Sequence, residues 1–254
     1  MRELVSEAEV VAASGDDDLV VWAAQGMRPG VRAWAYGEAV VVAGPETARR
    51  DRLAVRGEAG QVVPLLRHAL AESGPSYRPI GDAALIERVV AAVPELKLDG
   101  HFSWMGAEKL APPRRNATGP EGAGREGAAS WLADSAAPEV AELLAAANPG
   151  SYAVPGLPRV RRWAGVRDGS GVLLAVAADA WSAPTVGLLA GVATAVSARG
   201  RGLGERVCRF VVSALLAEHG RAALMVDDWN QAAIVVYERL GFTRRRVAVA
   251  GLRA

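Results

Sequence analysis

A short arginine- and glycine-rich segment in the C-terminal part of the chain has the composition of an anion-binding loop. It reads Arg199-Gly-Arg-Gly-Leu-Gly204 and lies between an apolar run and a helical pattern. Glycine allows a backbone to approach a ligand closely. The first N–H groups of the following helix lack partners within the helix and lie at the positive end of its dipole. The segment therefore predicts a site for a phosphate, with Arg199 and Arg201 adding positive charge.

The glycine spacing is a weak signal when it is taken alone. The loop lacks the Lys-Ser or Lys-Thr pair of a nucleotide P-loop, and its spacing differs from the Rossmann pattern. An arginine-rich surface turn with glycines at its ends explains the loop equally well.

A second pattern follows about one helix and one strand later. It reads Asn230-Gln-Ala-Ala-Ile-Val-Val-Tyr-Glu-Arg-Leu-Gly-Phe242. We expect a helix that begins after Asn230, carries Tyr237, and ends at Gly241, which is a good residue for a helix C-terminus. Without further context, Tyr237 is as well explained by an ordinary aromatic side chain half in the core.

Together the two patterns resemble signatures of the GNAT superfamily of N-acyltransferases. Arg199-x-x-Gly202-x-Gly204 is similar to the Arg/Gln-x-x-Gly-x-Gly/Ala motif of that family. Asn230 to Phe242 is similar to its Asn-x-x-Ala-x-x-x-Tyr-x-x-x-Gly-Phe signature. Both occur in the family's order, and the resemblance covers residues 131–254, about half of the chain.

This resemblance implies an enzyme that moves an acetyl or other acyl group directly from acetyl-CoA to a primary amine of a small molecule or peptide. Tyr237 would lie by the thioester sulfur and act as the acid for the leaving thiolate. The pantetheine arm would pair with the backbone of Val192, Ala193 and Thr194. The other residues implied in CoA binding are Arg199, Gly200, Arg201, Gly202, Leu203, Gly204 and Asn230. Acetyl-CoA is the implied co-substrate, and we expect no metal.

The sequence departs from the family at the general base. A free amine has a pKa near ~10.4, so a base or a site that lowers this pKa is needed. Many family members carry a glutamate in the strand before the loop, but Thr185–Thr194 contains no carboxylate. Asp227 and Asp228 are the nearest candidates, although aspartates there are also typical helix caps, and Asp179 is a third. The missing carboxylate keeps open an alternative function: a non-catalytic acyl-CoA-binding sensor or a partner-binding module.

The elements that must position these residues alternate between strands and helices. In the C-terminal part we expect helices over 137–147, after 204 and over 231–239, and strands over 160–166, 171–180, 185–194, 222–226 and 247–252. This order predicts a mixed α/β fold of the GNAT type, with a central mixed sheet flanked by helices and preceded by a smaller α/β N-terminal domain.

The clearest boundary is the Pro- and Gly-rich segment 111–127. It divides the chain into an N-terminal α/β domain, 1–110, and an acetyltransferase domain, 128–254. In the first we expect a helix over Arg2–Ala13 and a strand over Asp18–Ala24. Further along lies a strand, then a Gly57-Glu-Ala-Gly60 turn, then an amphipathic helix, which is the same order as around the CoA loop. We therefore hypothesise a degenerate second GNAT-like fold. An unrelated α/β cap is the other interpretation.

The bulk composition excludes several classes of protein. The chain has 29 basic and 28 acidic residues, which gives no global bias toward nucleic acid or an anionic membrane. One cysteine rules out an internal disulfide and suits the cytoplasm. The N-terminus lacks a signal-peptide core, and no apolar run is long enough to span a bilayer. We expect a cytoplasmic protein whose partners are acetyl-CoA and an amine acceptor, and we keep a homodimer open.

Overall fold

The computed structural model describes residues 1–113 and 127–253. The N-terminal half comprises β1 Arg2–Leu4, α1 Glu7–Ser14, α2 Asp18–Ala24, β2 Arg32–Tyr36, β3 Ala39–Thr47, β4 Arg50–Arg56, α3 Ala59–Ser73, β5 Arg78–Asp82, α4 Ala83–Ala92 and β6 Leu96–Ala107. The C-terminal half comprises β7 Ala129–Trp131, α5 Ala137–Ala147, β8 Val160–Arg167, β9 Leu173–Ala180, β10 Gly187–Thr194, α6 Leu203–His219, β11 Ala222–Val226, α7 Gln231–Leu240 and β12 Thr243–Leu252.

The strands form one twelve-stranded mixed sheet, in the order β1-β2-β3-β4-β5-β12-β6-β11-β10-β9-β8-β7. Neighbouring strands are antiparallel except for two parallel pairs, β4 with β5 and β10 with β11. This confirms the mixed α/β fold class predicted from the sequence.

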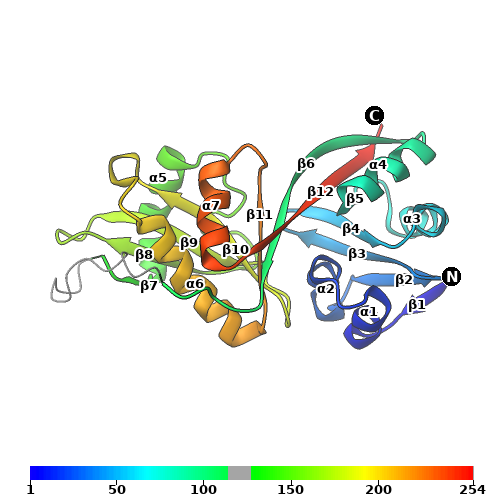
Figure 1. The fold of residues 1–254 in the computed structure, drawn as a ribbon, viewed down its shortest axis with the longest axis horizontal. Helices are drawn as coiled ribbons and strands as arrows, with labels where there is room; N and C mark the ends of the chain where they lie inside the picture. Colours follow the sequence, from blue (N-terminus) through cyan, green and yellow to red (C-terminus); the bar gives the residue numbers. More distant parts are fainter. Residues whose placement is uncertain (114–126, 254) are drawn as a thin grey trace.

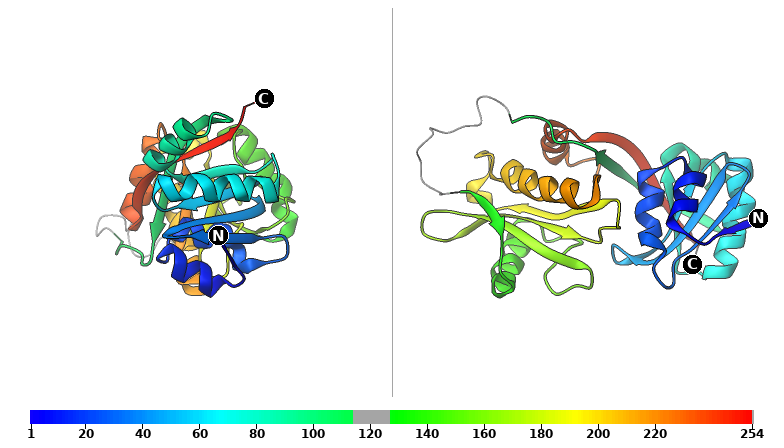
Figure 2. Two further views of the ribbon diagram at one scale, coloured as in Figure 1. Left: turned by 90° about the vertical axis from the view of Figure 1, so that its right-hand side faces the viewer. Right: turned by 90° about the horizontal axis from the view of Figure 1, so that it is seen from below.

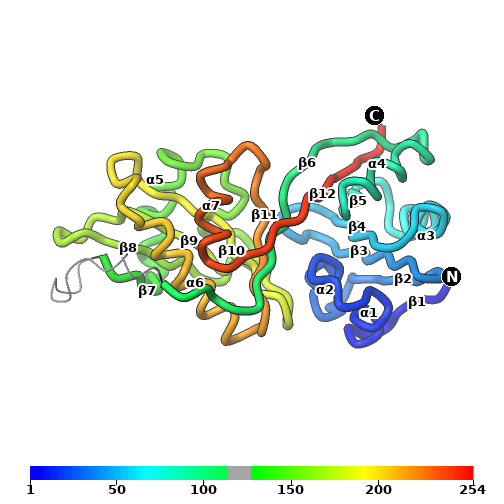
Figure 3. The backbone as a smooth tube through the Cα atoms, viewed as in Figure 1, coloured from blue at the N-terminus to red at the C-terminus, as the bar shows by residue number. Residues whose placement is uncertain are grey.

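The two halves repeat the same order of elements, except that two helices follow β1 and one follows β7, and they exchange their last strands. In each half, four strands pair antiparallel to one another. The fourth strand is followed by a helix and then by a fifth strand, which pairs parallel with the fourth. The last strand of the N-terminal half, β6, pairs with β11, and the last strand of the chain, β12, pairs with β5. Figure 1 shows β6 and β12 running side by side between the halves. Figure 3 shows the backbone leaving the N-terminal half along β6 and returning along β12.

Helices cover both faces of the sheet. One hydrophobic core joins α1, α2 and α5 to what we call the first face, in both halves of the molecule. On the second face, α3 and α4 cover the N-terminal half, and α6 and α7 cover the C-terminal half. In the right-hand view of Figure 2, α5 and α6 lie on opposite sides of the C-terminal strands. None of the described helices combines the length and the apolar character that a membrane span needs.

Two expectations for the N-terminal segment were wrong. Asp18–Ala24 is the helix α2, not a strand, because the Asp17 carboxylate accepts hydrogen bonds from the N–H groups of Leu19 and Val20 at 3.0 and 3.1 Å and caps it. Its apolar residues are buried all round, so the run carries no helical period to recognise. Arg2–Ala13 is divided: Arg2–Leu4 pairs with β2, and α1 begins only after the Ser6 cap.

The predicted domain boundary at 111–127 lies largely outside the described residues, which resume at Gly127. Where the chain is described, Ala111 is held by α7 and α6: its N–H donates to the Leu240 carbonyl at 2.9 Å, and its carbonyl accepts from Arg209 at 2.7 Å. The division into 1–110 and 128–254 stays a prediction.

Candidate active site

The parallel strands β10 and β11 separate partway along their length. They pair only from Gly187 opposite Ala222 to Leu189 opposite Leu224. Beyond Leu189, β10 continues to Thr194 with β9 as its paired neighbour. The main-chain groups of its last residues that point toward β11 therefore face a gap in the sheet.

A β-bulge lies in β10 at this gap. The register with β9 shifts between Ala190 and Ala193, and Gly191 there has φ of +62°. A bulge turns main-chain groups out of the regular ladder. The Val192 carbonyl accepts a hydrogen bond from the Asn148 side chain at 3.1 Å. Two of the residues implied in pantetheine binding, Val192 and Ala193, thus lie at or beside the bulge, and Thr194 ends the strand.

The glycine loop directly follows this strand and ends at the N-terminus of α6. Gly200 and Gly202 have φ of +76° and +74°, a region in which glycine is the favoured residue. Gly202 caps α6 without a side-chain hydrogen bond, so the first N–H groups of the helix stay available. A Cβ on Gly204 would lie 3.0 Å from the Thr194 hydroxyl oxygen, which shows how closely α6 approaches the end of β10.

The two loop arginines are exposed. The Arg199 guanidinium donates to the Ala147 carbonyl at the end of α5, at 3.2 Å. Arg201 is exposed beside the start of α6, near Leu203, which is buried and anchors the helix. Local positive charge and unpaired N–H groups therefore coincide at one end of the gap.

Tyr237 lies on α7, in the core on the second face of the sheet. It is 7% exposed and belongs to the same buried cluster as Leu189 and Leu224, the last paired residues of the two strands. Its ring meets that of Phe242 edge-on, with centroids 6.2 Å apart. Burial, with a further contribution from the nearby Cys208 thiol, raises the pKa of Tyr237 well above its usual range. The phenol therefore keeps its proton at neutral pH, as a proton donor must.

Cys208 on α6 is not a nucleophile in this arrangement. The side chain is completely buried, and burial raises the pKa of the thiol to about 12. The thiolate, which is the reactive form, is therefore scarce at neutral pH.

The structure gives Asn230 the capping role that the sequence left open for Asp227 and Asp228. Its side-chain oxygen accepts a hydrogen bond from the N–H of Ala233 at 3.3 Å, at the start of α7. Asn230 thus fixes the start of the helix that carries Tyr237.

Asp228 is held in a network of positive charge. Its carboxylate accepts hydrogen bonds from Ser103 at 2.6 Å, from Arg244 at 2.9 Å and from Arg246 at 3.2 Å. Partial burial raises the pKa of Asp228, but these hydrogen bonds outweigh it and hold the pKa below its usual value. A carboxylate with a lowered pKa is a weak base. Asp227, by contrast, is exposed at the end of β11.

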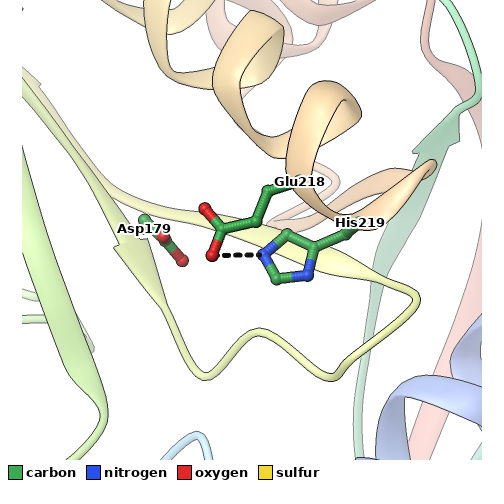
Figure 4. A group of neighbouring side chains, drawn as sticks. All are labelled: Asp179, Glu218 and His219. Atoms are coloured by element: carbon green, nitrogen blue, oxygen red, sulfur yellow. Dashed lines mark ion pairs between the residues drawn. The ribbon is translucent and has the colours of Figure 1, made fainter.

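The third carboxylate, Asp179, lies on the second face in a different cluster. It is fully buried, and Figure 4 shows it beside Glu218 and His219 at the end of α6. Ligand-type atoms of these three residues lie within 4.8 Å of one another. Arg161 and Arg162 each reach both carboxylates, at 3.4 and 3.2 Å from Asp179 and at 2.6 and 2.7 Å from Glu218.

This cluster is best explained as an ion-pair network. Two guanidinium groups already balance the two carboxylates, and a metal ion would have to displace them. This grouping leaves no pattern in the sequence, because Asp179 and His219 lie on separate elements that only packing brings together.

Comparisons with known proteins agree with this geometry. Residues 165–249, which include the gap, the loop and α7, match the family of FR47-like proteins. No curated protein matches the chain. A solved GCN5-related N-acetyltransferase from Kribbella flavida is 22% identical, with a TM-score of 0.59 over 91% of this chain and 92% of that one. The chain has the GNAT fold.

Two further structures show the same fold. A GNAT-family protein from Novosphingobium aromaticivorans is 21% identical, with a TM-score of 0.54 over 92% of this chain and 96% of that one. An acetyltransferase of the GNAT family from Colwellia psychrerythraea is 15% identical, with a TM-score of 0.52 over 100% and 99%. The similarity to GNAT structures therefore extends over both halves, whereas the sequence resemblance covered only the second.

Proposed function

We propose that the protein transfers an acyl group, most simply acetyl, from acetyl-CoA to a primary amine. The observation that carries this proposal is the continuity of three features: the gap between β10 and β11, the bulge at Gly191, and the glycine loop at the start of α6. Main-chain groups of Val192 to Thr194 would pair with the pantetheine arm. The loop from Arg199 to Gly204 would bind the pyrophosphate, because its N–H groups and arginines favour an anion.

The position of the loop determines the side from which the amine approaches. Because α6 covers the second face, CoA enters from that side. The amine then reaches the thioester from the first face, which carries α5 and the segment between α5 and β8. Ala153 of that segment lies against the bulge, 3.2 Å from the position that a Cβ on Gly191 would take.

The reaction forms a C–N bond and breaks the C–S bond of the thioester. Main-chain N–H groups at the bulge stabilise the negative charge that develops on the carbonyl oxygen. Tyr237 donates its proton to the departing CoA sulfur, and the phenolate regains a proton from solvent. The attacking nitrogen loses one proton to a base.

We propose Asp227 as that base, directly or through a water molecule. Among the described residues, Asp228 forms ion pairs with two arginines, whereas none reaches the Asp227 carboxylate. Asn230 acts by fixing the start of α7 and the end of the gap. The lone cysteine suits a reducing compartment, so we propose that the reaction takes place in the cytoplasm.

The test combines acetyl-CoA binding with thiol release. Calorimetry should show that the protein binds acetyl-CoA and that Gly202→Ala weakens binding, because a methyl group there strains a left-handed backbone. Gly74→Ala is the matched control, since Gly74 also has a positive φ, +106°, and open space around it, but lies at the end of α3. Absence of binding would contradict the proposal.

Thiol release across a panel of amines then separates an enzyme from a sensor. The absence of a carboxylate in β10 is the observation that favours a non-catalytic acyl-CoA-binding module. Tight binding of acetyl-CoA without turnover of any amine would support that second function. Amine-dependent thiol release that Asp227→Asn reduces supports the enzyme and its base.

A further inference from the structure

A cavity lies between the two halves of the molecule, on the first face of the sheet. Its volume is about 430 Å³. The N-terminal half contributes the turn between β3 and β4 and the start of β5. The C-terminal half contributes Leu157 to Arg159 and Trp181.

Arginine side chains gather in and around this cavity. Arg49, Arg50, Arg78 and Arg159 line it, and Arg28 and Arg52 lie beside it. Among the described residues only Arg78 has an ion pair, with Asp99 at 3.3 Å. The Arg49 guanidinium donates to the Tyr152 carbonyl at 3.4 Å, and Arg159 donates to the Gln25 side chain at 2.6 Å. These contacts are to neutral oxygens. Two carboxylates, Glu46 and Asp51, also line the cavity, but among the described residues neither forms an ion pair, and the arginines outnumber them.

Arg52 is the most exceptional of these side chains. It is 6% exposed, and its guanidinium donates a long hydrogen bond, 3.4 Å, to the Thr47 carbonyl. It lies directly beside Arg78 on the adjacent parallel strand. Burial, together with the charges of Arg50 and Arg78, lowers the pKa of Arg52 to about 10, although nearby Tyr152 opposes this. A buried cation without a carboxylate partner is costly, so the site is suited to an anion from outside the chain.

The backbone around the cavity is strained. Four of its lining residues have positive φ although they are not glycine: Glu46 at +50°, Arg49 at +62°, Arg159 at +63° and Trp181 at +56°. Such conformations are costly and cluster at ligand-binding sites. The strained residues come from both halves of the molecule.

The segment between α5 and β8 connects this cavity to the acyl-transfer gap. Its first residue, Asn148, binds the Val192 carbonyl at the bulge, and Ala153 lies against Gly191. Between them, the Tyr152 carbonyl accepts from Arg49 of the cavity. One short segment on the first face therefore lines the amine's approach and also touches the arginines.

We propose that this cavity binds the acid group of the acceptor, so that the acceptor is an amine that also carries a phosphate or a carboxylate. The role of the bound molecule rests on the acyl transfer proposed above. The anion site itself rests only on the arginines, their missing partners and the cavity.

Binding is tested first, on the full chain and without acetyl-CoA, with inorganic phosphate and succinate as probes. Each probe should raise the melting temperature of the wild type by a few degrees. Arg52→Met and Arg50→Gln should abolish most of this shift. Arg88→Gln on the exposed face of α4 is the matched control and should keep it. Arg201→Gln should also keep it, which excludes binding at the CoA loop as the cause.

The variants remain informative if one fails to fold. Arg50 is exposed, so Arg50→Gln is expected to fold. Without a probe, Arg52→Met should melt at or above the wild-type temperature, because it removes an uncompensated buried charge. Equal probe-induced shifts in Arg50→Gln, Arg52→Met and the wild type would overturn the proposal.

Kinetics then test the link to the acceptor. The substrates are matched amines with and without an acid group. The wild type should prefer the acidic amine by at least about tenfold in kcat/KM. Arg50→Gln should remove this preference and leave KM for acetyl-CoA unchanged. Amino phosphates and amino acids are separate arms that distinguish the two acid groups. Turnover without any acid preference would overturn this inference and leave the acyl transfer standing. Probe binding without acetyl-CoA binding would overturn the acyl transfer and leave the anion site standing.

Discussion

At the scale of single residues, Tyr237 combines two properties that rarely coincide in one side chain. It is buried in a core of apolar residues, yet the proposed reaction needs its hydroxyl beside the leaving thiolate. Burial raises its pKa, so its hydroxyl stays protonated at neutral pH and is a weaker acid than a free phenol. Its proposed chemistry and its packing therefore depend on the same environment.

We predict that Tyr237→Phe lowers kcat by about 10²-fold, the usual contribution of a general acid at the low end of its range. Binding of acetyl-CoA should hardly change, because phenylalanine retains the packing against Phe242. Steady-state thiol release measures kcat, and a thermal melt confirms the fold. An unchanged kcat would exclude Tyr237 as the acid.

Asp228 illustrates how a candidate base can be a structural residue. Its lowered pKa means that the folded state binds the proton less readily than the unfolded state. The resulting stabilisation is present above the ordinary carboxyl pKa of about 3.9 and is lost as the pH falls through the lower, folded-state value.

We predict that Asp228→Asn lowers the free energy of unfolding by about 1 kcal/mol at pH 7, because it weakens the hydrogen bonds to Ser103 and Arg244. The difference from the wild type should be constant between pH 7 and pH 5 and should shrink below about pH 3.9. Thiol release should persist. Asp227→Asn is the control, with unchanged stability and reduced turnover. Loss of turnover in Asp228→Asn alone would instead make Asp228 the base.

At the scale of elements, β10 has to meet two opposed requirements: pairing with its neighbours in the sheet, and leaving a gap beside β11 for the proposed site. A regular strand would pair with β11 along its whole length and close the gap. The bulge at Gly191 prevents this, and the Trp163 ring packs where a side chain at 191 would project. The indole N–H of Trp163 is buried without a partner in the described part of the chain.

We predict that Gly191→Ala lowers the free energy of unfolding by about 2 kcal/mol or more, because the methyl group meets both a positive φ and the Trp163 ring. The rate of thiol release should fall as well, since the bulge positions the main-chain N–H groups that we propose stabilise the oxyanion. Chemical denaturation measures the first effect. Gly200→Ala, with positive φ but open space, is the control and should cost less. A stable, fully active Gly191→Ala would show that the bulge is dispensable.

At the scale of the whole molecule, the exchange of β6 and β12 makes each half depend on the other. The two strands pair from Thr243 opposite Gly106 to Leu252 opposite Leu96. The arginine run at the start of β12 alternates with the strand: Arg244 and Arg246 pair with Asp228, whereas Arg245 pairs with Asp17 and Asp18 of the N-terminal half. A run that reads as solvated charge in the sequence thus joins the halves.

We predict that residues 1–113 and 127–254, produced as separate chains, do not fold alone. Each would expose the unpaired edge of a strand whose partner belongs to the other half, and such edges aggregate. Produced together, they should form a one-to-one complex. Size exclusion and circular dichroism measure this. A cooperative melt of either fragment by itself would contradict the dependence.

By itself, the sequence determined most of the elements of the C-terminal half and the loop, but it missed β7 and placed the start of β12 four residues late. The helix at 137–147 and the strand at 222–226 agree with the structure because their signals are local: a hydrophobic period and capping or breaking residues within a few positions. The same holds for the loop at Gly202, whose glycines precede a helix in the chain itself.

Only the tertiary structure decided which groups meet. The exchanged strands, the partners of Asp228 and the gathering of Arg52 with Arg78 and Arg159 all join residues that are distant in sequence. Strand pairing and charge placement depend on how buried faces pack, and hydrophobic patterns of similar composition allow many such pairings. The sequence prediction failed at Asp18–Ala24 for a similar reason. Complete burial on the first face removed the helical period that would have identified this segment as a helix.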